Sequence, residues 1–101
     1  MKLIIVLGVH EHQEQLSELF KEAGIPIFSK VDVEGFQSGS KQVDMSNWFG
    51  GGIDANSSIL FFAFVPKQLA EIIIEKVRTF NSDENRISPL HLFQLPVEKF
   101  I

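Results

Sequence analysis

The apolar residues of this chain change their spacing in a fixed order, and that order limits the folds it can adopt. Short continuous or alternating apolar runs, typical of strands, fall at residues 3–7, 27–36, 58–65 and 90–95. Apolar residues three and four apart, typical of amphipathic helices, fall at 16–23 and 66–80. The sequence therefore predicts the order strand, helix, strand, strand, helix, strand.

Glycine and proline mark the ends of these elements. Gly24 can adopt the left-handed conformation that ends the first helix, and Pro26 makes its continuation unfavourable. Pro66 suits the first turn of the second helix. Residues 37–56 are rich in Gly, Ser, Asn and Asp and lack a sustained period, which predicts a long loop.

This order of elements is that of the ferredoxin-like βαββαβ arrangement. We expect a single α+β domain over residues 1–101, with a four-stranded antiparallel sheet and both helices on one face. Ten Phe and one Trp are more than two helices can cover in a chain of 101 residues. The other sheet face is therefore expected to pack against further copies of the chain.

Composition excludes several classes of function. A net charge of −4 disfavours nucleic-acid binding, which needs a concentrated positive surface. The absence of Cys excludes disulfides and thiolate metal sites, and the N-terminus lacks a signal-peptide pattern. The longest apolar run, at 59–65, is far shorter than the roughly 20 residues of a membrane span. We expect a cytoplasmic protein without direct membrane insertion.

Three segments together resemble the PII-like signal-transduction family. They are Met1-Lys2-Leu3-Ile4, Val31-Asp32-Val33-Glu34-Gly35-Phe36 and Phe93-Gln94-Leu95-Pro96-Val97-Glu98. The resemblance implies a homotrimer that binds a small molecule or ion in clefts between subunits. It also implies that the loop at 37–56 controls a partner, such as a membrane transporter. The function expected is that of a non-enzymatic sensor.

The same resemblance implies which residues form the sites. Ligand contacts are expected from Gly35, Phe36, Gln37, Arg86 and His91. The aromatic pair Trp48-Phe49, followed by three glycines, could insert into a partner or fill a gap between subunits. Both interpretations of the pair remain open.

The chain departs from classical PII proteins in its modification site and in the elements that hold nucleotide phosphates. It has no Tyr, the residue that is uridylylated in classical members. Its segment 81–89 carries Asp83 and Glu84 in place of a glycine-rich phosphate-binding loop. His91 stands where a lysine is usual, and nothing basic follows Ile101 in this sequence. We therefore expect weak ATP binding, and the identity of any cofactor stays open.

A metal-binding function is the main alternative. His10 and His12 lie two residues apart and could share a metal, although Glu11 and Glu14 beside them also suit a plain helix start. With His91, they would support a trimeric metal-binding or metal-tolerance protein of related ferredoxin-like architecture. A small enzyme with a site between subunits is a third interpretation, but no nucleophile elbow, metalloprotease helix or phosphate loop is present.

Overall fold

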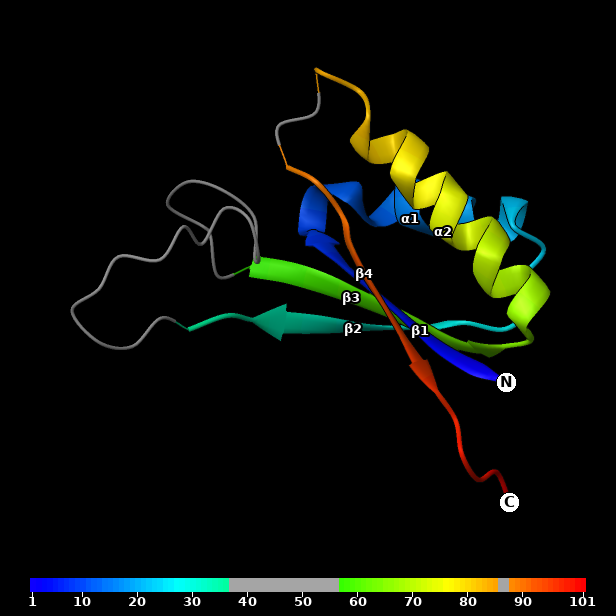
Figure 1. The fold of residues 1–101 in the computed structure, drawn as a ribbon. Coiled ribbons are helices and arrows are strands. Elements are labelled where there is room, and N and C mark those ends of the chain that lie inside the picture. The colour runs from blue at the N-terminus through cyan, green and yellow to red at the C-terminus, as the bar shows by residue number, and fades with distance from the viewer. Residues whose placement is uncertain (37–56, 86–87) are drawn as a thin grey trace.

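The structure is a computed structural model that describes residues 1–36, 57–85 and 88–101 (Figure 1). The elements are β1 (Lys2–Val9), the short 3-10 helix η1 (His10–His12), α1 (Gln13–Glu22), β2 (Ser29–Glu34), β3 (Ser57–Val65), α2 (Lys67–Asn81) and β4 (His91–Pro96). The predicted order of strands and helices is confirmed. Among the described residues, no helix has the length and apolar character needed to cross a membrane.

The four strands form one sheet in the order β2-β3-β1-β4, with every neighbouring pair antiparallel. The two most apolar strands, β1 and β3, lie in the centre, which is where strands are covered on both sides. Both helices pack on the same face of this sheet (Figure 1). The predicted α+β arrangement is therefore confirmed.

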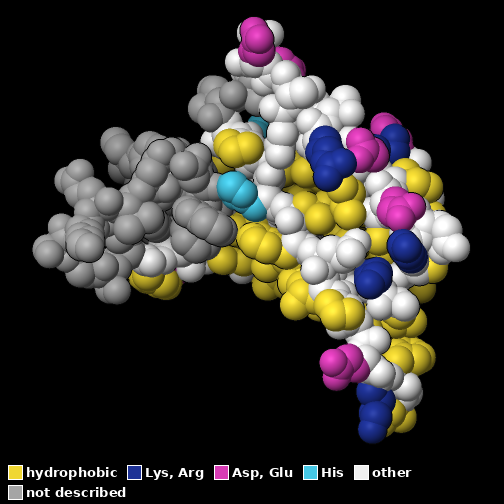
Figure 2. Space-filling view, in the orientation of Figure 1, with side chains coloured by type: hydrophobic (Ala, Val, Ile, Leu, Met, Phe, Trp, Pro, Cys, Tyr) yellow, Lys and Arg dark blue, Asp and Glu magenta, His cyan; other side chains and the backbone are white. Residues whose placement is uncertain are grey.

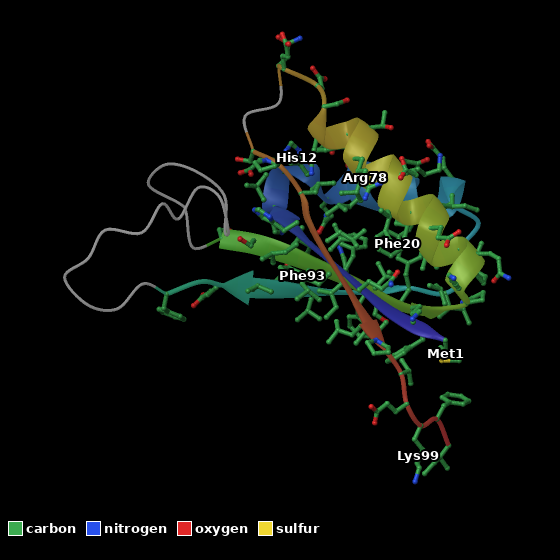
Figure 3. The ribbon with its side chains drawn as sticks, in the orientation of Figure 1. Met1, His12, Phe20, Arg78, Phe93 and Lys99 are labelled. Atoms are coloured by element: carbon green, nitrogen blue, oxygen red, sulfur yellow. The ribbon has the colours of Figure 1, made fainter. Side chains whose placement is uncertain are left out.

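The core lies between the helices and the sheet. Ile4, Val6, Ile59 and Phe61 point from β1 and β3 toward the helices and are almost fully buried. From the helices, Leu16, Phe20, Ala70, Ile73 and Val77 fill the space opposite them. Figure 3 shows Phe20 in this layer. The apolar stripes predicted for the two helices are thus the surfaces they bury.

The first helix ends as the sequence predicts. Gly24 has a φ of 80°, a left-handed conformation that costs glycine little. The amide of Gly24 donates to the carbonyl of Lys21, and that of Ile25 donates to the carbonyl of Phe20. These two bonds, with buried Phe20 against buried Ile25, form a Schellman cap that turns the chain toward β2.

Some boundaries differ from the predicted ones. β1 extends past Gly8, because Gly8 and Val9 still pair with Ile59 and Ser58 of β3. β2 begins at Ser29, two residues after the predicted start, and Ile27 is exposed. β4 begins at His91, one residue later than predicted.

The second sheet face is apolar and carries no helix. Its members alternate with the core residues along each strand, and we call this surface the open face. They are Leu3, Ile5, Leu7 and Val9 of β1; Ser29, Val31 and Val33 of β2; Ser58, Leu60, Phe62 and Phe64 of β3; and His91, Phe93 and Leu95 of β4. Val31, Phe64, Phe93 and Leu95 are between 41% and 56% exposed. Figure 2 shows hydrophobic side chains gathered over the strands, and Figure 3 shows Phe93 among them.

The charged residues of β2 lie on the helix side of the sheet and remain exposed to solvent. Lys30 pairs with Phe61, a core residue, so both lie on the helix side of the sheet. Lys30 Nζ donates to Gln13 Oε1 at 2.8 Å. β2 is an edge strand, and its register with β3 places Val31 and Val33 on the open face.

Candidate functional site

One end of the sheet gathers most of the residues expected to form a site. β1 and β2 finish there, while β3 and β4 begin there (Figure 1). Gly35 and Phe36 follow β2, η1 follows β1, and His91 opens β4. Both segments that the structure leaves undescribed, 37–56 and 86–87, also connect to the chain at this end. We call this region the connector end.

The sheet register places His91 in a row across the open face. His91 pairs with Leu7, Leu7 with Leu60, and Leu60 with Val31. The imidazole therefore stands at the edge of an otherwise apolar row. A ligand beside His91 would have one polar contact and a hydrophobic surface next to it.

Burial lowers the pKa of His91 from its ordinary value of 6.5. Loss of solvent penalises the charged imidazolium, so the neutral ring dominates at pH 7. A neutral imidazole can donate or accept a hydrogen bond but does not supply the positive charge that attracts a phosphate. The structure thus strengthens the expectation from sequence that His91 is a poor replacement for a phosphate-binding lysine.

Asn81 fixes the backbone immediately before His91. Its side-chain Nδ2 donates to the Leu90 carbonyl at 2.8 Å, and the Leu90 amide donates to Asn81 Oδ1 at 2.7 Å. The Leu90 side chain is buried. These contacts bind the C-terminal end of α2 to the start of β4, so both ends of segment 82–89 are held in place.

His10 and His12 lie on η1, near the connector end, but they face different neighbours. His10 Nε2 lies 3.5 Å from Asp32 Oδ1 of β2. The ring of His12 contacts that of Phe80 edge-on, with centroids 5.1 Å apart. Figure 3 shows His12 close to the end of α2. Within residues 1–36, 57–85 and 88–101, no group of three or more His, Cys, Asp or Glu side chains could hold a metal ion.

The remaining predicted residues divide into two groups. Gly35 is buried directly after β2, and Phe36 beside it is 79% exposed. The structure therefore offers Phe36 to a ligand, a partner or another subunit. Gln37, Trp48, Phe49 and Arg86 lie outside the described residues. The proposed roles of all these residues remain predictions.

Sequence reasoning missed Asn81 and the polar pairs along β2. The sequence places Asn81 in a polar connector, although an Asn at the end of an amphipathic helix is a signal for a side-chain to backbone bond. The alternation of β2 puts Lys30 and Asp32 on a solvated strand face. In the structure they contact Gln13 and His10 and connect β2 to the start of α1.

Comparison with solved structures identifies the class of fold. A PII-like signalling protein of Thermus thermophilus matches with a TM-score of 0.63 and 14% identity, over 93% of this chain and 83% of that one. CPII, a nitrogen regulatory PII-like protein of Thiomonas intermedia bound to ADP, AMP and bicarbonate, matches with a TM-score of 0.60 and 20% identity. That match covers 99% of this chain and 94% of CPII. Apo CPII matches similarly, with a TM-score of 0.59, 19% identity, and coverage of 93% and 89%.

These matches confirm the resemblance at the level of the fold. No protein-family profile matches the sequence. No curated protein matches it either. The chain therefore has the fold of the PII-like proteins to which it is compared above, at 14% to 20% sequence identity.

Proposed function

We propose that this chain is a non-enzymatic PII-like regulator that binds a small ligand between the subunits of a homotrimer. The observation that carries the proposal is the connector end, where His91 of β4 and Gly35 and Phe36 after β2 lie at the same end of the sheet but at its opposite edges, beside the attachment points of segments 37–56 and 82–89. A ligand bound between two subunits at this end would contact the base of segment 82–89 of one chain and the base of segment 37–56 of its neighbour. Binding would thereby change how residues 37–56, including Trp48 and Phe49, meet a partner such as a membrane transporter.

The open face supports the assembly. Eleven of its fourteen residues are apolar, and four of them are more than two-fifths exposed in the single chain. A monomer rarely leaves so continuous an apolar surface in water. Closure of three sheets around a common axis would bury it and bring the connector end of each subunit close to a neighbour.

The chemistry of the connector end favours a ligand smaller than a nucleotide. Asp83 and Glu84 place negative charge in the segment after α2, and the neutral His91 adds no positive charge. CPII is bound to ADP, AMP and bicarbonate, so ligands of both sizes occur on this fold. For this chain we propose a singly charged anion of the bicarbonate type, because the carboxylates repel it less than they repel the several charges of a nucleotide phosphate, and nucleotides are bound weakly.

Calorimetric titration of the full chain with bicarbonate, AMP, ADP and ATP tests the ligand proposal. We expect measurable binding of bicarbonate and only weak, roughly millimolar binding of ATP. His91→Ala should abolish the bicarbonate signal, whereas Lys67→Ala, at the start of α2 and the far end of the sheet, should preserve it. The proposal fails if none of the four ligands binds, or if His91→Ala binds as the wild type does.

A further inference from the structure

A groove runs along α1 and α2 on the side of the molecule opposite the open face. Its volume is about 870 Å³. Three apolar residues form its floor: Leu19 of α1, and Ile72 and Phe80 of α2. Ile72 is 43% exposed, whereas Phe80 is buried. The groove therefore presents an accessible apolar strip between two helices.

The rim of the groove is acidic. Glu71 and Glu75 stand one turn apart on α2, Glu22 lies across from them on α1, and Asp83 lies just beyond α2. Among the described residues, Lys76 is the single cation in the lining. It lies 3.5 Å from Glu22, and Arg78 outside the groove pairs with Glu75. The carboxylates still outnumber the cations.

The negative charge continues along α1. A second hollow of about 390 Å³ shares Leu19, Glu22 and Phe80 with the groove and adds Glu14 and Glu18. Lys21 lies 3.9 Å from Glu18 in an exposed pair, which screens that charge weakly. The two hollows together form an apolar strip bordered by carboxylates, and such a surface attracts cationic ligands from solution.

We propose that this groove binds a basic amphipathic helix of a partner protein. The α2 residues that line it run from Gln68 to Phe80, a length of about 18 Å, or roughly three helical turns. A helix with apolar residues three and four apart would fill the floor, and its Lys or Arg residues would face the rim. This inference goes beyond the proposed function, because the groove and the open face lie on opposite sides of the sheet and can be occupied together.

A second copy of this chain does not fit the groove. The Lys and Arg residues of the described segments are spread singly, and no described helix carries a basic stripe. Contact between two such grooves would place carboxylate against carboxylate, which disfavours self-association. Charge complementarity therefore selects a partner of different sequence.

The test uses a fluorescent synthetic helix of about 16 residues, with Leu at helical spacing and Lys between, enough to span the groove. Anisotropy should show binding that weakens as salt is raised. The double variant Glu71→Gln/Glu75→Gln and the single variant Ile72→Ala should each weaken binding by about tenfold. Both changes lie at exposed positions, and far-ultraviolet circular dichroism confirms that the variants remain folded.

The matched control removes the same charge elsewhere. Glu34→Gln/Glu98→Gln, outside the groove, should leave the affinity within about twofold of wild type. A peptide of the same composition with its Leu residues scrambled should bind at least about tenfold more weakly. The proposal is overturned if the designed peptide does not bind, if the control variant weakens it equally, or if the scrambled peptide binds as well. None of these outcomes depends on the ligand at His91.

Discussion

Asn81 and Leu90 are joined by two reciprocal hydrogen bonds, one from the Asn81 side-chain amide and one to its carbonyl oxygen, at 2.8 and 2.7 Å. This pair sets where α2 ends and where β4 begins. It also explains why β4 starts at His91, since both backbone groups of Leu90 are already used by Asn81. The position of His91 at the connector end thus depends on a residue ten positions earlier in the chain.

Asn81→Ala removes both bonds and leaves the partly buried amide and carbonyl of Leu90 without this side chain. We expect a loss of about 2 kcal/mol in the free energy of unfolding, measured by urea denaturation. Asn85→Ala is the matched control, because only the backbone amide of Asn85 is bonded, to Asp83 Oδ1. Equal stability of Asn81→Ala and wild type would show that the Asn81–Leu90 pair does not hold segment 82–89 in place.

The lowered pKa of His91 predicts a pH dependence of stability. The unfolded chain binds a proton near pH 6.5, whereas folded His91 binds it only at lower pH. The contribution of His91 to the free energy of unfolding is therefore fully present above pH 6.5. It decreases as the pH falls toward the folded pKa. Thermal unfolding of wild type and His91→Gln, measured between about pH 5 and 8, compares the pH dependence of their stabilities. This range brackets the ordinary histidine pKa of about 6.5.

The His91→Gln variant should lose that component of the pH dependence. The gap in melting temperature between the two proteins should change over the lower part of this range and stay constant above about pH 7. A gap that is the same at every pH would contradict the assignment. A parallel titration by NMR of the His91 ring gives the pKa directly.

Negative charge after α2 is expected to oppose nucleotide binding. Glu84→Lys reverses one charge in the segment before His91, and should strengthen ATP binding by about fivefold in calorimetry. Glu98→Lys makes the same change of net charge beyond β4 and should have a smaller effect. Micromolar ATP binding by the wild type would show that these carboxylates do not weaken the site.

Much of the fold follows from periodicity alone. The stripes of α1 and α2 and the apolar runs of β1 and β3 are long, and each agrees with the cap or proline beside it. β2 is less predictable because its alternation shows that one side is apolar but not which side faces the helices. Only the pairing of Val31 with Leu60, far along the chain, decides that.

The sequence proposes members for the candidate site but does not predict their arrangement. The resemblance to PII-like proteins indicates Gly35, Phe36 and His91, and the fold places them at one end of the sheet, at its two opposite edges. The Asn81 contact to Leu90 and the acidic groove beside Ile72 depend on how helices pack on the sheet. The Asn81 contact has only the weak signal of an Asn at a helix end, and the groove has no local sequence pattern.

Closure of the open face is the central claim, and Phe64 tests it. Phe64 is 56% exposed on β3, where the register places it in a row with Leu3 and Leu95. Ile72, 43% exposed on the helix side, is a matched apolar position outside the predicted interface. A charge at Phe64 would be buried in a trimer, whereas a charge at Ile72 would remain in solvent.

Light scattering of the full chain at micromolar concentration measures the assembly directly. We predict about three times the 11.4 kDa chain mass for wild type and Ile72→Lys, and the mass of one chain for Phe64→Lys. A single-chain mass for the wild type, or an intact trimer of Phe64→Lys, would contradict closure of the open face.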